Sequence, residues 1–391
     1  MLEVQEHRQA GVPWSAGYRV ECLADGPSFL DVEAEWNRLV DEAAVEHPFL
    51  RHEWLRVWWD CFGEGNRLAV VLVRANGRLV AAAPLMSNGA RMCGLRARRL
   101  QTIYNVHTPR LGLIVAPGHE GAYRAVWRHI AERDDWDVLE LNQLPEGSPT
   151  LDRITELAAA DGFPCERWSS GDAPYVPLRG SWADYFEGLA AKHRSNLRNR
   201  LKRLSKIGDV ELETVSEPGP ALEAALQDGL RIEAAGWKGE EGTAIRCEDD
   251  IRGFYSRYAQ AAARRDLLRL QFLVVGGTRI AFAYSIVHAG KLFLLKTGYD
   301  PEYSKYSPFN VLLRKVLEDC FDSGLDEFEF LGVFDRWKES WAELARPHCW
   351  AYVFAKTPTA RLIRGAKFGV IPKVKQILGV PESDGAKASG G

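Results

Sequence analysis

The sequence lacks the apolar run of about 18 residues that a membrane-spanning helix needs. Its first residues also lack the apolar core of a secretion signal. Neither sign of charge dominates, because 50 Lys and Arg stand against 53 Asp and Glu. Such a balance argues against a protein that packages nucleic acid. We therefore expect a cytoplasmic protein that does not bind DNA.

The sequence also lacks the motifs of several common sites. Its seven cysteines are scattered and none forms a C-x-x-C pair, so neither a zinc site nor a disulfide framework is expected. Glycine-rich dinucleotide and nucleotide-phosphate motifs are missing, as are H-E-x-x-H and G-x-S-x-G. These absences exclude typical zinc proteases and α/β-hydrolases, and we expect no metal cofactor.

Two segments of the chain resemble each other. Residues 67–86 (RLAVVLVRANGRLVAAAPLM) and 268–287 (LRLQFLVVGGTRIAFAYSIV) each read as two apolar strands around a tight turn, at Asn76-Gly77 and Gly276-Gly277. A further strand, a helix and an alternating strand follow each hairpin. The helices are expected at Glu120–Arg133 and Pro308–Asp322, and the last strands at Trp136–Leu141 and Leu325–Leu331. This order predicts two similar α/β domains, although any α/β protein contains such units.

Helical periodicity precedes each hairpin. It predicts helices at Phe29–Ala44, Phe49–Phe62, Lys192–Ile207, Ala221–Ala235 and Asp249–Arg265. The turn-rich Ser169–Pro177 (SSGDAPYVP) predicts a domain boundary. We expect domains at 18–170 and 171–357, a basic amphipathic helix at 358–380, and a disordered tail at 381–391, which is small and polar.

The predicted helix at Lys192–Ile207 is strongly basic. Its cations lie above a stripe of leucines at helical spacing. The residues Lys192, Arg194 and Arg198 could bind a polyanion, such as the phosphates of a nucleotide, a sugar nucleotide or a tRNA. A solvated cationic face on a packed helix explains the pattern equally well.

Three further segments carry candidate residues. Glycines in Glu233–Ile245 (EAAGWKGEEGTAI) predict a loop, which is either functional or a surface turn. Leu294–Leu313 (LLKTGYDPEYSKYSPFNVLL) reads as a strand, a tyrosine-rich loop and a helix with Ser307 as N-cap and Pro308 in its first turn. A loop that enters a helix can bind an anion, although many capped helices bind none. Gly332–Trp341 (GVFDRWKESW) carries tryptophans that line a pocket or pack in a core.

These segments resemble a known family. The resemblance is to the CelD/BcsL-like acetyltransferases of the GNAT superfamily, and the residues that carry it are KHRSNLRNRLKRLSKIGDV, GWKGEEGTAI, LRLQFLVVGGTRIAFAYSIV, LLKTGYDPEYSKYSP, FLGVFDRWKESW and the amino-terminal HEWLRVWWDCFGEGNRLAVVLV. More distantly, the basic helix resembles that of Fem-type peptidyltransferases, which use aminoacyl-tRNA and contain two GNAT-like domains. The resemblance implies an α/β (α+β) fold of tandem GNAT-like domains. Each domain would have a mixed, mostly antiparallel sheet flanked by helices.

The resemblance implies an N-acyltransferase that moves an acyl group, in the first place acetyl from acetyl-CoA, to an amine. The acceptor would be a polysaccharide precursor or a small metabolite. Two splayed strands would hold the acyl-CoA, and its pyrophosphate would rest on Tyr303, Lys305, Tyr306, Ser307 and Asn310. This chain has Phe309 where related proteins often have glycine, and a bulky side chain hinders close approach of phosphate to the backbone.

The same resemblance assigns roles to single residues. Asp300 or Glu233 would accept the amine proton, and Tyr299 or Tyr306 would protonate the leaving thiolate. Lys296 and Lys238 would stabilise the oxyanion or bind substrate phosphates. The residues expected to bind or enclose the substrate are Lys192, Arg194, Arg198, Trp237, Trp337 and Lys338.

Two other functions remain open. The first is an aminoacyl-tRNA-dependent transferase that forms an amide or peptide bond. The second is a non-catalytic accessory protein of exopolysaccharide synthesis. The basic and apolar segment RLIRGAKFGVIPKVKQIL near the carboxyl terminus could lie on an anionic membrane or dock on a partner. It could equally be a solvated helix after a closing strand.

Overall fold

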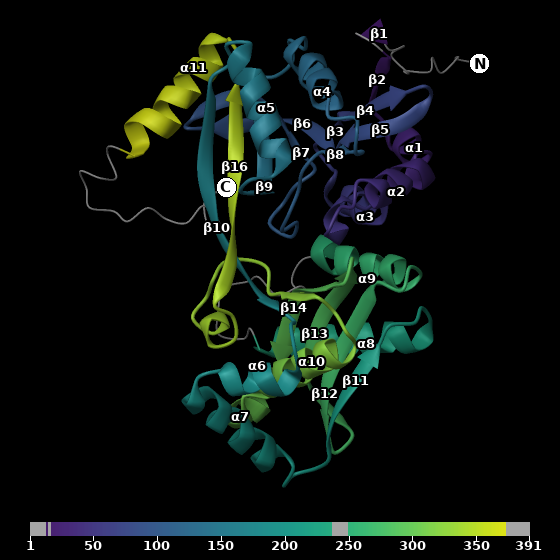
Figure 1. The fold of residues 1–391 in the computed structure, drawn as a ribbon, viewed down its shortest axis with the longest axis vertical. Coiled ribbons are helices and arrows are strands. Elements are labelled where there is room, and N and C mark those ends of the chain that lie inside the picture. Colours follow the sequence, from purple (N-terminus) through teal and green to yellow (C-terminus); the bar gives the residue numbers. More distant parts are fainter. Residues whose placement is uncertain (1–12, 15–16, 237–248, 373–391) are drawn as a thin grey trace. The chain divides into compact units, whose positions relative to one another are not determined.

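The computed structural model describes residues 13–14, 17–236 and 249–372. The chain divides into two units (Figure 1). Unit 1 comprises the described part of Met1–Val45, Phe49–Gly171 and Pro347–Gly391, and unit 2 that of Glu46–Pro48 and Asp172–Arg346. Each unit contains strands that pair mostly antiparallel, with helices packed on them. This confirms the predicted α/β (α+β) fold class. Every helix among the described residues is too short or too polar to cross a bilayer.

Unit 1 contains two sheets. One runs in the order β1-β2-β4-β5-β8, and the other runs β16-β9-β7-β6-β3. Asn76 and Gly77 join β4 to β5 with φ values of 49° and 79°, so the predicted hairpin turn is confirmed. Helix α2 packs on β5, and α4 packs on β2, β4 and β5. The elements are β1 Pro13–Trp14, β2 Tyr18–Leu23, α1 Gly26–Leu30, α2 Glu33–Glu42, α3 His52–Phe62, β3 Arg67–Leu68, β4 Val70–Ala75, β5 Arg78–Ala83, β6 Leu85–Met92, β7 Leu95–Thr102, β8 Ile114–Val115, α4 Ala122–Ala131, β9 Val138–Pro145 and α5 Pro149–Ala160.

Unit 2 is a sheet in the order β11-β12-β13-β14-β15-β10. The predicted turn at Gly276-Gly277, with φ values of 55° and 81°, joins β12 to β13. The helix predicted at Pro308–Asp322 has the predicted bounds. The elements are α6 Trp182–Gly188, α7 Ala191–Leu204, β11 Val210–Val215, α8 Pro220–Gly236, α9 Asp249–Ala263, β12 Leu268–Val275, β13 Thr278–His288, β14 Lys291–Tyr299, η3 Pro301–Tyr306, α10 Pro308–Asp322, β15 Glu327–Glu329 and η4 Lys338–Ser340.

The two faces of the unit 2 sheet carry different helices. Because successive side chains of a strand point to opposite faces, Ala281 and Ala283 of β13 share one face, where they join the apolar core built on α10. Phe282 and Tyr284 lie on the other face. A Cβ atom added at Gly229 of α8 would stand 2.9 Å from the Phe282 ring, and the Tyr284 ring contacts that of Tyr255 of α9. The sheet is therefore enclosed between α10 and the pair α8 and α9.

Apart from the short segment Glu46–Pro48, the chain passes between the units within two long strands. These are β10 (Cys165–Pro177), which pairs with β15, and β16 (Leu344–Phe354), which pairs with β9. The stretch predicted as a turn-rich boundary is thus a strand, although the division of the units falls inside it, after Gly171. Residues from Pro347 onward belong to unit 1, and not to the second domain as expected, because β16 completes the unit 1 sheet.

The expected carboxyl-terminal helix begins as predicted. It consists of α11 (Pro358–Arg364) and a π-helical turn at Gly365–Val370. Residues 373–391, with the tail predicted to be disordered, lie outside the described residues.

Candidate active site

Two neighbouring strands of unit 2 part from each other. Strand β14 pairs in parallel with β15 only where Lys291–Phe293 faces Glu327–Glu329. After Glu329, Leu331 and Gly332 adopt left-handed conformations, with φ values of 58° and 60°, and turn the chain. Within the described residues, the part of β14 after Phe293 therefore has no strand partner on its β15 side, while β13 pairs with it up to Tyr299. Backbone N–H groups along such an open edge are available to a ligand.

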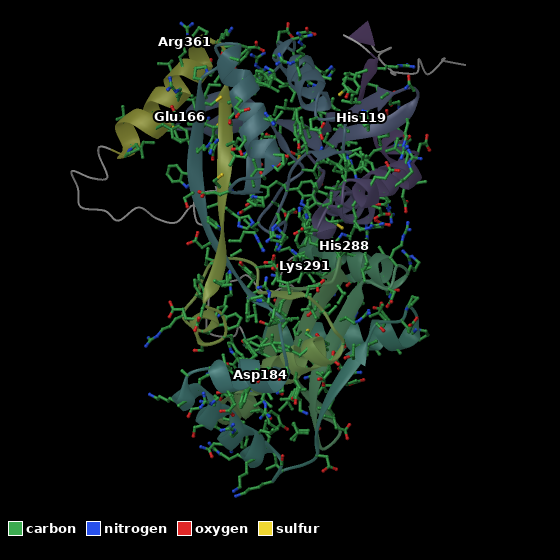
Figure 2. The ribbon with its side chains drawn as sticks, viewed as in Figure 1. His119, Glu166, Asp184, His288, Lys291 and Arg361 are labelled. Atoms are coloured by element: carbon green, nitrogen blue, oxygen red, sulfur yellow. The ribbon has the colours of Figure 1, made fainter. Side chains whose placement is uncertain are left out.

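A β-bulge lies at the point where the strands part. Ser285 of β13 pairs with Leu294 and Tyr284 pairs with Lys296, so Leu295 is the extra residue on β14. The bulge reverses the alternation of side chains along β14. Leu294 belongs to the core on the α10 face, whereas Lys296, opposite Tyr284, lies on the face of α8 and α9. Figure 2 labels His288 and Lys291, which face each other at the closed end of this hairpin.

Lys296 lies in a cluster of buried polar groups. Its ammonium is 5.3 Å from the centre of the Tyr255 ring. The pKa of Lys296 is lowered because burial removes water from the ammonium, although the charge of Glu233 acts in the opposite direction. Glu233 is a buried residue of α8. Burial, and secondly the charge of Glu233, raises the pKa of Tyr255, so its phenol keeps its proton.

Close packing of α8 on β14 brings this cluster together. Gly298 of β14 has no side chain, and a Cβ atom there would stand 2.8 Å from the Cα atom of Glu233. The hydroxyl of Tyr284 donates a hydrogen bond of 3.1 Å to the backbone carbonyl of Tyr255, which ties α9 to the same face. The structure thus places together two predicted catalytic residues, Lys296 and Glu233.

The amino terminus of α10 has no side-chain cap. Ser307 occupies the predicted N-cap position, but with φ 47° and ψ 61° its side chain makes no capping hydrogen bond. Pro308 is the first helical residue, as predicted. Asn310 accepts a hydrogen bond of 3.4 Å from the indole of Trp341. The ring of Phe309 packs against Trp337, with 5.3 Å between ring centres.

Cations surround the predicted donor-binding loop. The guanidinium of Arg203 lies 5.2 Å from the centre of the Tyr306 ring, and the ammonium of Lys305 lies 5.1 Å from it. Tyr303 is half-buried against the core. Arg203 comes from α7, which contacts both η3 and α10. The positive end of the α10 dipole and these two cations together favour an anion.

Two of the three named cations of the basic helix α7 have protein partners. Arg194 and Arg198 both form ion pairs with Glu187 of α6, and Arg194 also donates to the backbone carbonyls of Glu187 and Leu189. Lys192 is exposed. The two arginines therefore join α6 to α7, and their role in binding substrate stays a prediction.

Several other predicted residues have contacts within their own loop. The ammonium of Lys338 donates to the backbone carbonyls of Leu331, at 2.9 Å, and Val333, at 2.7 Å. Asp300 caps η3 by accepting a 3.0 Å hydrogen bond from the N–H of Glu302. Tyr299 and Trp337 are 39% and 37% exposed, so both remain accessible to a ligand. Trp237 and Lys238 lie outside the described residues.

Sequence reasoning missed three neighbours of the site. Tyr255 lies among aromatic residues of α9 that read as ordinary core, and Arg203 was one cation among many on α7. The His193 ring lies edge-on to Trp341, with 4.7 Å between ring centres, and burial lowers its pKa. Their positions along the helices did not mark them as site residues, because each lies at the site only through contact with a residue distant in sequence. Groups of acidic, His or Cys residues suited to a metal ion are absent from the described part of the chain.

Comparisons with known proteins agree with this geometry. Residues 191–339, which lie within unit 2, match the family model of an acetyltransferase (GNAT) domain. No curated protein matches the chain. FemX shares 11% identity at a TM-score of 0.59, over 85% of this chain and 98% of that chain.

Two further solved structures share the fold. One is the carboxyl-terminal DUF2156 domain of a protein described as a lysylphosphatidylglycerol synthetase from Agrobacterium fabrum, with 13% identity and a TM-score of 0.54 over 86% of this chain and 96% of that chain. The other is a conserved protein of unknown function from Bacteroides thetaiotaomicron, with 12% identity and a TM-score of 0.50 over 82% of this chain and 97% of that chain. These structures show the shared fold, and the family match identifies residues 191–339 of unit 2 as a GNAT-type acyltransferase domain.

Proposed function

We propose that unit 2 transfers an acyl group, in the first place acetyl, from acyl-CoA to an amine. The observation that carries this proposal is the parting of β14 from β15 after Phe293, inside the segment that matches the acetyltransferase domain. A thioester at the open edge of β14 would meet free backbone N–H donors, which suit a developing oxyanion. Lys296 lies on this part of β14, and Glu233 of α8 packs against the same strand at Gly298.

Unit 1 differs from unit 2 at the corresponding strands. There β7 and β9 pair in parallel at Arg99–Gln101, and directly afterwards the hydroxyl of Thr102 donates a 2.8 Å hydrogen bond to the side-chain carbonyl of Asn142. Both residues are fully buried. Just before α4, the carboxylate of Glu120 accepts a hydrogen bond from the N–H of Gly118. Backbone hydrogen bonds lower the pKa of Glu120. A fixed negative charge at a helix amino terminus repels phosphate, so we assign the donor to unit 2.

The reaction needs one proton to leave the amine and one to reach the leaving group. The neutral amine attacks the thioester carbonyl carbon, and the C–S bond breaks as the tetrahedral intermediate collapses. We assign Glu233 as the group that accepts the amine proton, directly or through water, because Asp300 is engaged as a helix cap. Lys296 would hold the oxyanion or the acceptor, and Tyr299 at the end of β14 would protonate the thiolate.

The pyrophosphate of the donor would lie at the amino terminus of α10. Pro308 has no N–H group, and the N–H groups of Asn310 and Val311 donate to the backbone carbonyl of Ser307. Because Ser307 supplies no side-chain cap, the N–H of Phe309 would be the donor from the first turn to the phosphate. Arg203 and Lys305 supply positive charge beside Tyr306. Phe309 packs on Trp337, which gives the bulky residue a place away from a bound phosphate.

The acceptor in this proposal is an amine on a polysaccharide precursor or a small metabolite, as expected for a CelD/BcsL-like protein. An anionic acceptor would find exposed cations on α7 at Lys192 and Lys202, and just after this helix at Lys206. Trp337, which remains accessible, offers a flat surface for a sugar or another ring.

Substitution of Ser307 tests the donor site. Ser307→Asp places a carboxylate at the end of α10, whereas Ser307→Asn has the same shape without the charge, and both residues tolerate left-handed φ. Titration calorimetry with acetyl-CoA should show at least tenfold weaker binding for Ser307→Asp and little change for Ser307→Asn. Equal affinity in both variants would remove α10 from the donor site. Consumption of acetyl-CoA with a panel of amino sugars, followed by mass spectrometry, then tests the transfer itself.

The exposed cations of α7 and the likeness in fold to FemX favour a second candidate, transfer of an aminoacyl group from tRNA. Binding of tRNA should then weaken steeply with salt. The slope of the logarithm of the binding constant against the logarithm of the salt concentration should become smaller by about one when either Lys202 or Lys206 is replaced by a neutral residue. Activity that survives ribonuclease treatment would argue against this donor.

A further inference from the structure

The hairpin of β6 and β7 in unit 1 places two arginines directly opposite each other. Arg91 and Arg96 are cross-strand partners next to the tight turn at Cys93-Gly94, whose φ values are 49° and 81°. Directly opposed residues of an antiparallel pair have Cβ atoms about 4.5–5.5 Å apart, and like charges there repel. Because the two-residue turn fixes the register, the two guanidinium groups are held on the same face of the hairpin.

In the described part of the chain, no acidic side chain pairs with these two arginines. Among the described residues, the side chain of neither Arg91 nor Arg96 has a hydrogen bond or an ion pair, and both residues are exposed. Arg98, two residues along β7, differs. It forms a forked ion pair with Asp137, through Nη2 at 3.0 Å and Nε at 3.2 Å, and its Nη1 donates to the backbone carbonyl of Asp134. The charge of Asp137 is therefore engaged by Arg98, while the positive charge of Arg91 and Arg96 remains unbalanced.

A groove lies beside the pair. Its volume is about 550 Å³, and its lining consists of Gly89, Ala90, Arg91, Arg96, Ala97, Arg98 and Asp137. Pockets for small ligands are typically about 300–1,000 Å³. The lining includes a glycine and two alanines, which leave room between the long arginine side chains. Three arginines and one aspartate give this lining a net positive charge.

We propose that this groove binds a phosphate group, with Arg91 and Arg96 as its ligands. A guanidinium donates two parallel hydrogen bonds to phosphate oxygens, and two guanidinium groups on one face complement the negative charge of a phosphate group. A bound phosphate would also remove the repulsion between the opposed arginines. The phosphate could belong to a free metabolite or to a lipid headgroup, which share this chemistry. The site lies wholly within unit 1 and is independent of the proposed acyl transfer.

The test compares two double variants of the full chain. Arg91→Gln with Arg96→Gln removes the proposed ligands. Arg124→Gln with Arg128→Gln removes two exposed arginines from one face of α4, whose side chains have no partner among the described residues, and serves as the matched control. Both are made in a Ser307→Asp background, so that binding at α10 does not contribute. The probes are sodium pyrophosphate in titration calorimetry and phosphatidylglycerol vesicles in flotation.

The parent chain should bind at least one probe, and Arg91→Gln with Arg96→Gln should weaken that binding at least tenfold. The control should bind like the parent. Binding of pyrophosphate identifies a soluble phosphate as the ligand, and binding of vesicles alone identifies a lipid headgroup. If the parent binds neither probe, or if both double variants bind equally well, the groove is not a phosphate site.

Discussion

Gly298 of β14 lies so close to Glu233 of α8 that a Cβ atom at position 298 would stand 2.8 Å from the Glu233 Cα atom. Real Cβ atoms do not approach other atoms that closely, so Gly298→Ala must move either the helix or the strand. Both elements carry candidate catalytic residues. We expect a loss of about 1–3 kcal/mol in the free energy of unfolding, measured by urea denaturation, and at least tenfold lower acyl transfer.

Gly188→Ala is the matched control for this substitution. Gly188 ends α6 in the same unit, and a Cβ atom there would meet nothing within 4 Å. Its stability and activity should stay close to those of the parent. A Gly298→Ala protein that is as stable and active as Gly188→Ala would show that the contact between α8 and β14 is not needed for the site.

Glu233 and Asp300 can be separated by two isosteric substitutions. Glu233→Gln keeps the volume of the side chain but removes the proton acceptor, so kcat should fall by about 10²–10⁴-fold. Asp300→Asn should leave kcat unchanged, because the structure uses Asp300 to cap η3. It should cost roughly 1 kcal/mol of stability or less. The reverse pattern of kcat values would make Asp300 the base.

Local sequence signals predicted much of the fold. Asn76-Gly77 and Gly276-Gly277 specify tight hairpin turns because both positions need positive φ. Pro308 marked the start of α10 correctly. Strand β10 was missed because Gly171 and Pro174 read as turn residues. Its pairing with β15 at Tyr175–Pro177 depends on residues distant in sequence. The assignment of β16 to unit 1 depends on pairing with the distant β9, which no local pattern reveals.

The candidate site was predictable only in part. Strict alternation along β14 places Lys296 on the same face as Leu294, but the bulge at Leu295 moves it to the opposite face, beside Tyr255. A bulge of this kind leaves no mark in a run of apolar residues. The ion pairs of Arg194 and Arg198 with Glu187 likewise depend on how α6 packs against α7.

Lys338 is expected to stabilise the loop after β15. Lys338→Met would leave the carbonyls of Leu331 and Val333 without the charged donor that they share. Loss of such hydrogen bonds to a buried charged group should cost about 2–3 kcal/mol in the free energy of unfolding. At temperatures well below the melting point, the KM for acceptor should change little. A large rise in KM with unchanged stability would instead support the predicted role in substrate binding.

His52 should make the stability of the protein sensitive to acid. The side chain is fully buried, and its Nε2 lies 2.8 Å from the backbone carbonyl of Phe29, to which it donates. Burial is the main cause that lowers its pKa, whereas an unfolded histidine titrates at about 6.5. Below that pH the unfolded chain binds a proton that the folded chain does not, so the free energy of unfolding falls as the pH falls. The slope for one group reaches at most about 1.4 kcal/mol per pH unit.

Urea denaturation between pH 7.5 and pH 5 measures this effect. His52→Gln keeps a donor for the carbonyl of Phe29 but cannot titrate, so its stability should depend less on pH than that of the parent. His119→Gln is the control, because His119 (Figure 2) is only half-buried beside Tyr18. Since other histidines also contribute to the acid sensitivity, the difference between the two variants is the relevant quantity. Identical pH slopes for His52→Gln and the parent would show that His52 takes up its proton equally in the folded and unfolded states.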